Sequence, residues 1–299
     1  MRKLLGFCVL VVLISSSNGY GQSTNKAAEE NLTKGDKAYE SNDFNSAITY
    51  YTKAIELDPK SAAAFSGRGD SYGELKKYPE AIADYTKAIE LDPKSVKAYG
   101  SRGFTYAELK KYPEAIADFN KAIELDPKSA KAYGHRGLAY SDLKKYPEAI
   151  ADYTKAIELG AKDDADVYSA RGDAYFNLKK YPEAIADLTK AIELDPKYVD
   201  AYNDRGFTYF NLKKYPEAIA DYTKAIEIGA KDDADVYYAR GNSYGELKKY
   251  PEAIADYTKA IELDPKFVDA YSNRGNAYKS FGKTKEAEAD FAKAKALEK

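Results

Sequence analysis

The sequence predicts an all-α fold, an α-solenoid of stacked antiparallel helix pairs, and two observations carry this prediction. First, the block KKYPEAIADYTKAIELDPK recurs with few changes from Lys76 to the C-terminal region. Second, one glycine marks the same point of every unit, with steps of 34 or 35 residues, at Gly35, Gly69, Gly103, Gly137, Gly172, Gly206, Gly241 and Gly275. A period of this size is typical of an array of supersecondary units. The sequence therefore predicts eight repeats over residues 28–299, of which the last acts as a cap.

The N-terminal segment differs in kind from the repeats. Two basic residues precede an apolar run over residues 4–14, and small polar residues follow. This layout is typical of a secretory signal peptide, and the run is short for a membrane-spanning helix. We expect a signal peptide over residues 1–21, a short linker over 22–27, and an exported chain, periplasmic or secreted, without stable membrane insertion after cleavage. Cleavage after Gly19 and an uncleaved anchor are the alternatives.

The unit around Gly103 shows why each half of a repeat is helical. Ser95 suits a helix N-cap, and the spacing of Tyr99, Gly103, Tyr106 and Leu109 places these residues on one helix face.

A turn is expected over residues 110–112. Pro113 then suits the first position of a second helix, and Asp126 ends it because the residue before a proline is disfavoured in a helix. The second helix carries small or apolar residues in two adjacent seams: Ala115, Phe119 and Ala122 in one, and Ile116 and Ile123 in the other. Helices of this length are marginal alone in water, so stacking must stabilise them.

The marker glycine indicates a close approach between helices. A glycine inside a helix is less favourable than alanine by about 0.8–1 kcal/mol, so its repeated use needs a steric reason. We expect Gly103 to face a flat surface made by Ala115 and Ala122 of the second helix.

The repeat resembles the tetratricopeptide repeat family, and the resemblance covers residues 28–299. The residues that carry it in one unit are Tyr99, Gly103, Tyr106, Ala115, Phe119, Ala122 and Pro127. The resemblance implies a right-handed superhelix in which the first helix of each pair lines a concave groove. The end units depart from the pattern: the first has Ala38 where others have tyrosine, and the last has Glu288 and Lys295 where inner units have isoleucine.

Catalytic chemistry is not indicated. His135 is the one histidine, and no cysteine follows the predicted signal peptide, which excludes cysteine nucleophiles and histidine or cysteine metal clusters. We expect His135 to be packed or solvated. Carboxylates such as Glu80 and Asp84 recur with the repeat, which we interpret as a solvated helix face. We predict no enzyme activity, no metal and no cofactor.

Charge and short motifs exclude other partners. The chain has 46 basic and 48 acidic residues, so no basic excess favours a nucleic-acid partner. Two Arg-Gly-Asp triplets, at residues 68–70 and 171–173, contain marker glycines and are expected inside helices, which argues against an adhesion motif. The acidic runs over residues 162–166 and 231–235 are interpreted as helix caps because they lack the spacing of a calcium loop.

The candidate binding residues lie on the face of the first helix where the repeats differ. Phenylalanines among them are the expected apolar anchors, although neutral drift at solvent positions would produce the same variation. The candidates are Asp70, Phe104, Leu138, Asp173, Phe176, Phe207, Phe210, Tyr238, Asn242 and Asn276. Six residues before the marker glycine, Lys97 and Lys131 give way to aspartates in later units: Asp166, Asp200, Asp235 and Asp269. Two explanations of these aspartates are equally good: stabilisation of the helix N-terminus through the helix dipole, and recognition of a ligand.

These observations predict a non-catalytic scaffold that binds a protein or extended peptide in the concave groove. The alternative is a structural or self-assembling envelope protein without a dedicated peptide ligand.

Overall fold

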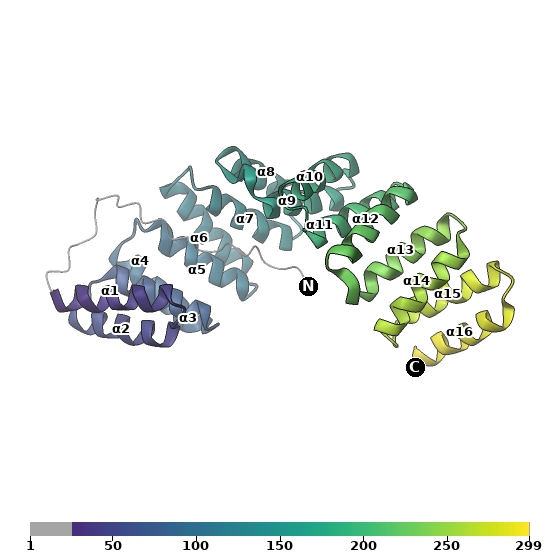
Figure 1. Ribbon diagram of the computed structural model, residues 1–299. Helices are drawn as coiled ribbons and strands as arrows, with labels where there is room; N and C mark the ends of the chain where they lie inside the picture. The colour runs from purple at the N-terminus through teal and green to yellow at the C-terminus, as the bar shows by residue number, and fades with distance from the viewer. Residues whose placement is uncertain (1–25, 299) are drawn as a thin grey trace. The chain divides into compact units, whose positions relative to one another are not determined.

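A computed structural model describes residues 26–298, and Figure 1 shows that this part of the chain is built from helices. Over these residues there are sixteen α-helices, two short 3₁₀ helices and no strand. The predicted all-α fold is confirmed. The predicted signal peptide, and residues 22–25 of the predicted linker, lie outside the described residues.

The chain divides into two compact units, one ending at Lys162 and the other beginning at Asp163. The helices of the first unit are α1 Lys26–Glu40, α2 Phe44–Leu57, α3 Ala62–Glu74, α4 Tyr78–Leu91, α5 Val96–Glu108, α6 Tyr112–Leu125, α7 Ala130–Asp142 and α8 Tyr146–Glu158. Those of the second unit are α9 Ala165–Asn177, α10 Tyr181–Leu194, α11 Val199–Asn211, α12 Tyr215–Ile228, α13 Ala234–Glu246, α14 Tyr250–Leu263, α15 Val268–Ser280 and α16 Thr284–Leu297.

Within each unit the helices stack in pairs, as the sequence predicts. Each odd-numbered helix packs against the even-numbered helix that follows it, and each even-numbered helix packs against the next pair. Consecutive odd-numbered helices also touch, α3 with α5 in the first unit and α11 with α13 in the second. The odd-numbered helices, called the first helices below, therefore form one layer in each unit.

The local chemistry around α5 and α6 agrees with the sequence. The Ser95 hydroxyl accepts a hydrogen bond from the Ala98 backbone N–H at 3.2 Å and caps α5. The helix ends in a Schellman motif, in which Lys111 N–H donates to the Tyr106 carbonyl at 2.9 Å and Lys110 has a left-handed φ of 58°. Pro113 is the second residue of α6, one position later than predicted.

The marker glycine is required by an aromatic ring. A Cβ on Gly103 would lie 2.9 Å from Cε1 of Phe119 and 3.2 Å from the Ala115 carbonyl oxygen. The expectation that alanine side chains provide the facing surface was therefore wrong, because the ring of Phe119, itself 0% exposed, fills that place. A close contact with the residue sixteen positions after the glycine recurs in every pair, with an aromatic ring in seven of them and Leu188 in the other: Tyr51, Tyr85, Phe119, Tyr153, Leu188, Tyr222, Tyr257 and Phe291.

The structure also corrects the interpretation of the recurring aspartate. Asp84 is 6% exposed and accepts two hydrogen bonds from Arg68, at 2.7 Å from Nε and 2.8 Å from Nη2. The third guanidinium nitrogen, Nη1, donates to Thr52 on the preceding helix pair at 3.1 Å. Asp84 thus belongs to a buried ion pair, whereas Glu80 is exposed as predicted.

We call these contacts the Arg–Asp clamps. They tie the two helices of a pair together. A hydrogen bond from Nη1 also ties the arginine to the preceding pair at Arg68, Arg102, Arg136, Arg205, Arg240 and Arg274. The clamps are Arg68–Asp84, Arg102–Asp118, Arg136–Asp152, Arg171–Asp187, Arg205–Asp221, Arg240–Asp256 and Arg274–Asp290.

The end helix α16 differs from the inner ones. Ile89 of α4 packs with Ala98 of the following pair, as expected for a seam between repeats. In α16, Glu288 and Lys295 replace the isoleucines and are exposed. Their role as a cap stays a prediction.

Candidate functional site

The candidate site is the exposed side of the first helices, which we call the first-helix face. It is defined by two positions of each first helix, the residue directly after the marker glycine and the residue six before it. These positions are seven residues apart, or about two helical turns, so they share one side of the helix. An ion pair of 2.8 Å joins Lys97 Nζ on α5 to Asp70 Oδ2 on α3. The earlier position of one first helix therefore lies beside the later position of the preceding one.

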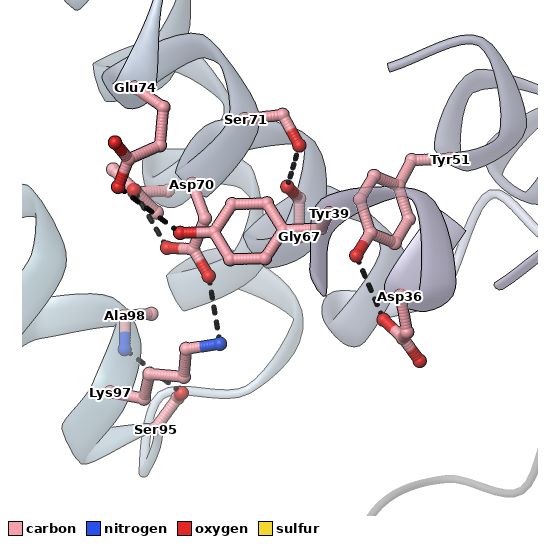
Figure 2. A network of polar contacts seen from close by, with 11 residues as sticks. Asp36, Tyr39, Tyr51, Gly67, Asp70, Ser71, Glu74, Ser95, Lys97 and Ala98 are labelled. Carbon is pink, nitrogen blue, oxygen red and sulfur yellow. Dashed lines mark hydrogen bonds and ion pairs between the residues drawn. The ribbon is translucent and has the colours of Figure 1, made fainter. Parts of the chain in front are cut away.

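In the first unit, Asp70 is occupied by contacts within the protein (Figure 2). One carboxylate oxygen accepts from the Tyr85 hydroxyl at 2.8 Å and the other binds Lys97. In the adjacent pair, the Tyr51 hydroxyl donates to Asp36 at 2.8 Å. Burial raises the pKa of Tyr51 and Tyr85 well above the ordinary tyrosine value, so both phenols stay protonated and act as donors.

His135 lies between two aromatic rings and belongs to the packing of the first unit. Its ring centroid is 5.7 Å from Phe119, in a stacked arrangement, and 5.4 Å from Phe104. Burial, and secondarily the charge of Lys131, lowers the pKa of His135 to about 3. The imidazole is therefore neutral at physiological pH, in line with the expectation of a packed residue. Phe104 and Leu138 are half-buried.

In the second unit, Phe207 of α11 presents its ring to solvent. Phe207 is 48% exposed, and its ring centroid is 5.2 Å from that of Phe176 on α9. Phe210 is half-buried and meets Tyr215, the first residue of α12, at 5.5 Å in an edge-to-face arrangement. Of the expected apolar anchors, the structure brings Phe176 and Phe207 together and turns Phe210 toward its own helix hairpin. Asp173 is half-buried on α9.

The polar candidates of α13 are held in an internal network. Asn242 Oδ1 accepts from the Tyr257 hydroxyl at 2.8 Å and from Asn273 Nδ2 at 2.9 Å. Tyr238 accepts a second bond from Asn273 at 2.9 Å and packs against Phe267. Asn276 of α15 is exposed.

The two units differ in charge at the earlier position of the face. The first unit is mixed there, with Glu29, Ala63, Lys97 and Lys131, whereas the second has aspartate on all four first helices: Asp166, Asp200, Asp235 and Asp269. Asp166 accepts from the Tyr198 hydroxyl at 2.6 Å. The other three are exposed, and no lysine or arginine within residues 26–298 forms an ion pair with them.

The motifs that suggested other activities lie inside structural elements. The Arg-Gly-Asp triplets fall within α3 and α9, where Arg68 and Arg171 are committed to clamps. In the acidic runs, Asp164 and Asp233 cap α9 and α13 by accepting backbone hydrogen bonds at 3.0–3.4 Å. In the described part of the chain no cluster of metal-ligating side chains is found. Among the same residues, no helix is long and apolar enough to cross a bilayer.

Sequence reasoning missed the Arg–Asp clamps, although their signal is visible. In seven of the eight units an arginine directly precedes the marker glycine, and in the same seven units an aspartate lies fifteen residues after that glycine. Opposite charges that recur at fixed offsets on two helices of one hairpin indicate pairing.

Family models match most of the chain. Models described as tetratricopeptide repeat match residues 32–96, 96–129, 130–161, 199–230 and 268–299, and one described as TPR repeat matches 172–213 and 241–282. No curated protein matches the sequence.

Solved structures are similar in fold. The C-terminal part of a TPR repeat-containing protein from Cytophaga hutchinsonii is 23% identical with a TM-score of 0.66, over 81% of this chain and 98% of that one. A tetratricopeptide repeat protein from Parabacteroides merdae is 23% identical with a TM-score of 0.62, over 85% and 99%. YrrB, described as a TPR protein with an unusual peptide-binding site, is 26% identical with a TM-score of 0.55, over 62% and 95%.

Proposed function

Because this chain belongs to the tetratricopeptide repeat family, we propose that it is a non-catalytic scaffold that binds a protein or an extended peptide on its first-helix face. Repeat arrays of this type offer extended surfaces for binding. The peptide-binding site in the description of YrrB supports the same role here. The signal-peptide pattern of residues 1–21 supports export, so we propose a partner outside the cytoplasm.

The observation that carries the proposal is the exposed ring of Phe207. The equivalent residues Asp36, Asp70 and Asn242 each accept a hydrogen bond from the tyrosine fifteen residues later. Phe207 cannot accept one, and within the described residues the buried hydroxyl of Tyr222 has no hydrogen-bond partner.

The phenylalanine is therefore unfavourable for folding in two ways. It leaves an unsatisfied buried hydroxyl, which costs about 1–3 kcal/mol, and it exposes an aromatic ring to water. A residue that weakens the fold at an exposed position is most simply explained by a partner that covers it. Aromatic side chains of this kind are the usual anchors of protein interfaces.

A phage-displayed library of random peptides, selected on the purified chain, tests the proposal. We expect recovered peptides to bind, and the Phe207→Ala/Phe210→Ala variant to lose at least about tenfold in affinity with its helical circular dichroism unchanged.

Phe281→Ala is the matched control, because Phe281 is also 48% exposed but lies in the turn after α15. The proposed function is contradicted if the recovered peptides bind the Phe207→Ala/Phe210→Ala variant as tightly as the Phe281→Ala variant, or if the library yields no binder. Sedimentation of the free chain is measured alongside, since self-assembly through this face would appear as concentration-dependent association.

A further inference from the structure

We propose that the first-helix face of the second unit recognises a cationic, extended segment of a partner protein, with lysine or arginine side chains about three residues apart. This inference rests on the proposed function and names the chemistry of its partner. It is argued from the charge of the face, from the spacing of its helices and from the ring of Phe207.

The first unit shows what a cation does on this face. Lys97 of α5 binds the carboxylate of Asp70 on α3 at 2.8 Å, so a positive side chain of the protein itself fills the place between two first helices. In the second unit the residue equivalent to Lys97 is Asp200, on the first helix that follows Asp173. By the same geometry Asp200 lies beside Asp173. Two carboxylates therefore stand next to each other at the place where the first unit pairs a lysine with an aspartate.

The carboxylates form a row rather than one cluster. Asp166, Asp200, Asp235 and Asp269 stand at the same position of four consecutive first helices, and α9–α11, α11–α13 and α13–α15 are in contact. Packed helices lie about 8–10 Å apart. An extended chain rises about 3.3 Å per residue, so every third residue of a segment crossing the helices would meet the next carboxylate. This sets the spacing of the cations.

Phe207 gives the row an apolar neighbour with its own preference for cations. Phe207 is seven residues after Asp200 on α11. On the next first helix, α13, Asp235 is the residue equivalent to Lys97, so Asp235 lies beside Phe207 as Lys97 lies beside Asp70. A guanidinium or ammonium group over an aromatic face is attracted by the ring, most strongly for arginine. The aromatic pair Phe176–Phe207 and the carboxylates thus favour the same type of side chain.

The helix dipole alone accounts for part of the pattern but not for its distribution. An aspartate in the first turn stabilises a helix by about 0.3–1 kcal/mol, and this applies equally to all eight first helices. Yet α5 and α7 have lysine at the same position, which the dipole disfavours, and all four helices of the second unit have aspartate.

Fluorescence anisotropy with a fluorescein-labelled peptide tests the proposal on the purified chain. The probe has arginine at every third position, separated by serine and leucine. One comparison peptide has the same composition with contiguous arginines, and another has glutamate for arginine. We expect the spaced arginine peptide to bind most tightly. The D200N/D235N/D269N variant should lose at least about tenfold in affinity, and more at low salt than at high salt.

The matched control is E183Q/E217Q/E252Q, which removes the same number of charges from exposed first-turn positions of α10, α12 and α14. We expect it to change affinity by less than about twofold. Asp200→Lys is a second variant, because it copies the native Lys97–Asp70 arrangement, and it should also weaken binding.

The inference is overturned if E183Q/E217Q/E252Q loses as much peptide affinity as D200N/D235N/D269N, or if the glutamate peptide binds as tightly as the spaced arginine peptide. If the displayed library yields neutral or acidic peptides whose binding requires Phe207, the proposed function stands and this inference fails. If no peptide requires Phe207, both fail.

Discussion

The helix pairs α3–α4 and α11–α12 share the packing of the marker glycine and the Arg–Asp clamp, and they differ at the residue directly after that glycine. Both have the marker glycine against a tyrosine ring, Gly69 on Tyr85 and Gly206 on Tyr222. Both have an Arg–Asp clamp with distances of 2.7–2.8 Å. Directly after the glycine, however, α3 has Asp70, which satisfies the tyrosine hydroxyl, and α11 has the exposed Phe207.

This difference separates two kinds of position in the repeat. The clamps and the glycine contacts hold the two helices of a pair together. Because loss of these contacts would expose the core, the residues that form them recur in the repeats. The residue after the glycine contributes through polar contacts at the surface of the pair, such as the hydrogen bond and the ion pair of Asp70, and it can be exchanged for a binding side chain at modest cost. Three perturbations test this separation, from the largest expected effect to the smallest.

Breaking the clamp should damage both pairs equally. Asp84→Ala and Asp221→Ala each leave a mostly buried guanidinium without its bidentate partner, with arginine side chains only 16–19% exposed. Removal of one partner from a buried ion pair costs about 3–5 kcal/mol, and we expect the lower end here because some water reaches the arginine. Urea denaturation followed by circular dichroism measures the loss of free energy of unfolding.

Glu80→Ala is the control, since Glu80 is exposed and should change the stability by less than about 0.5 kcal/mol. A negligible loss for Asp84→Ala would show that the clamps contribute no net stability.

Exchanging the residue after the glycine should have opposite effects in the two pairs. Phe207→Asn supplies an acceptor for the Tyr222 hydroxyl, as Asn242 does for Tyr257 at 2.8 Å, and should stabilise the chain by about 0.5–1.5 kcal/mol. Asp70→Phe removes the acceptor of Tyr85 and should destabilise it by about 1–3 kcal/mol. Thermal unfolding of both variants measures the changes, and Phe207→Asn should at the same time lose peptide binding.

Removing the hydroxyl groups checks this explanation. Tyr222→Phe should be neutral or stabilising, whereas Tyr85→Phe should cost about 1 kcal/mol, because only Tyr85 donates to a partner. If both changes cost the same, the asymmetry between the pairs does not come from the hydroxyl groups.

The sequence predicted the fold well because the repeat states each local signal many times. Ser95, Pro113 and Gly103 each mark a cap, a helix start or a close approach by their own chemistry. The partner of the glycine and the environment of Asp84 depend on which side chains meet across the hairpin. A charged residue on a helix looks solvated until the opposing Arg68 is placed, which is why the clamps were missed.

The candidate site was predicted only as a face. Spacing along one helix placed Phe207 and Asn242 at equivalent positions, but it could not show that Asn242 is occupied by Tyr257 and Asn273 while the ring of Phe207 is exposed. Those differences come from residues of neighbouring helices.

The smallest expected effect lies in a turn that both pairs share. Lys76 and Lys213 have left-handed φ values of 58° and 59°, whereas the last pair has Gly282, with φ 83°, at the same place. A left-handed residue with a Cβ costs about 1–2 kcal/mol, and the greater freedom of glycine in the unfolded chain offsets about 0.5–1 kcal/mol of that cost. Lys76→Gly and Lys213→Gly should therefore each stabilise the chain by about 0.5 kcal/mol, as measured by urea denaturation, with peptide binding unchanged. The turn is the same in both pairs, whereas their first helices also differ at other positions, such as Gly73 and Phe210. A gain in only one pair would mean that these other differences alter the response of the pair to substitution, and the effects of Asp70→Phe and Phe207→Asn could then no longer be assigned to the residue after the marker glycine alone.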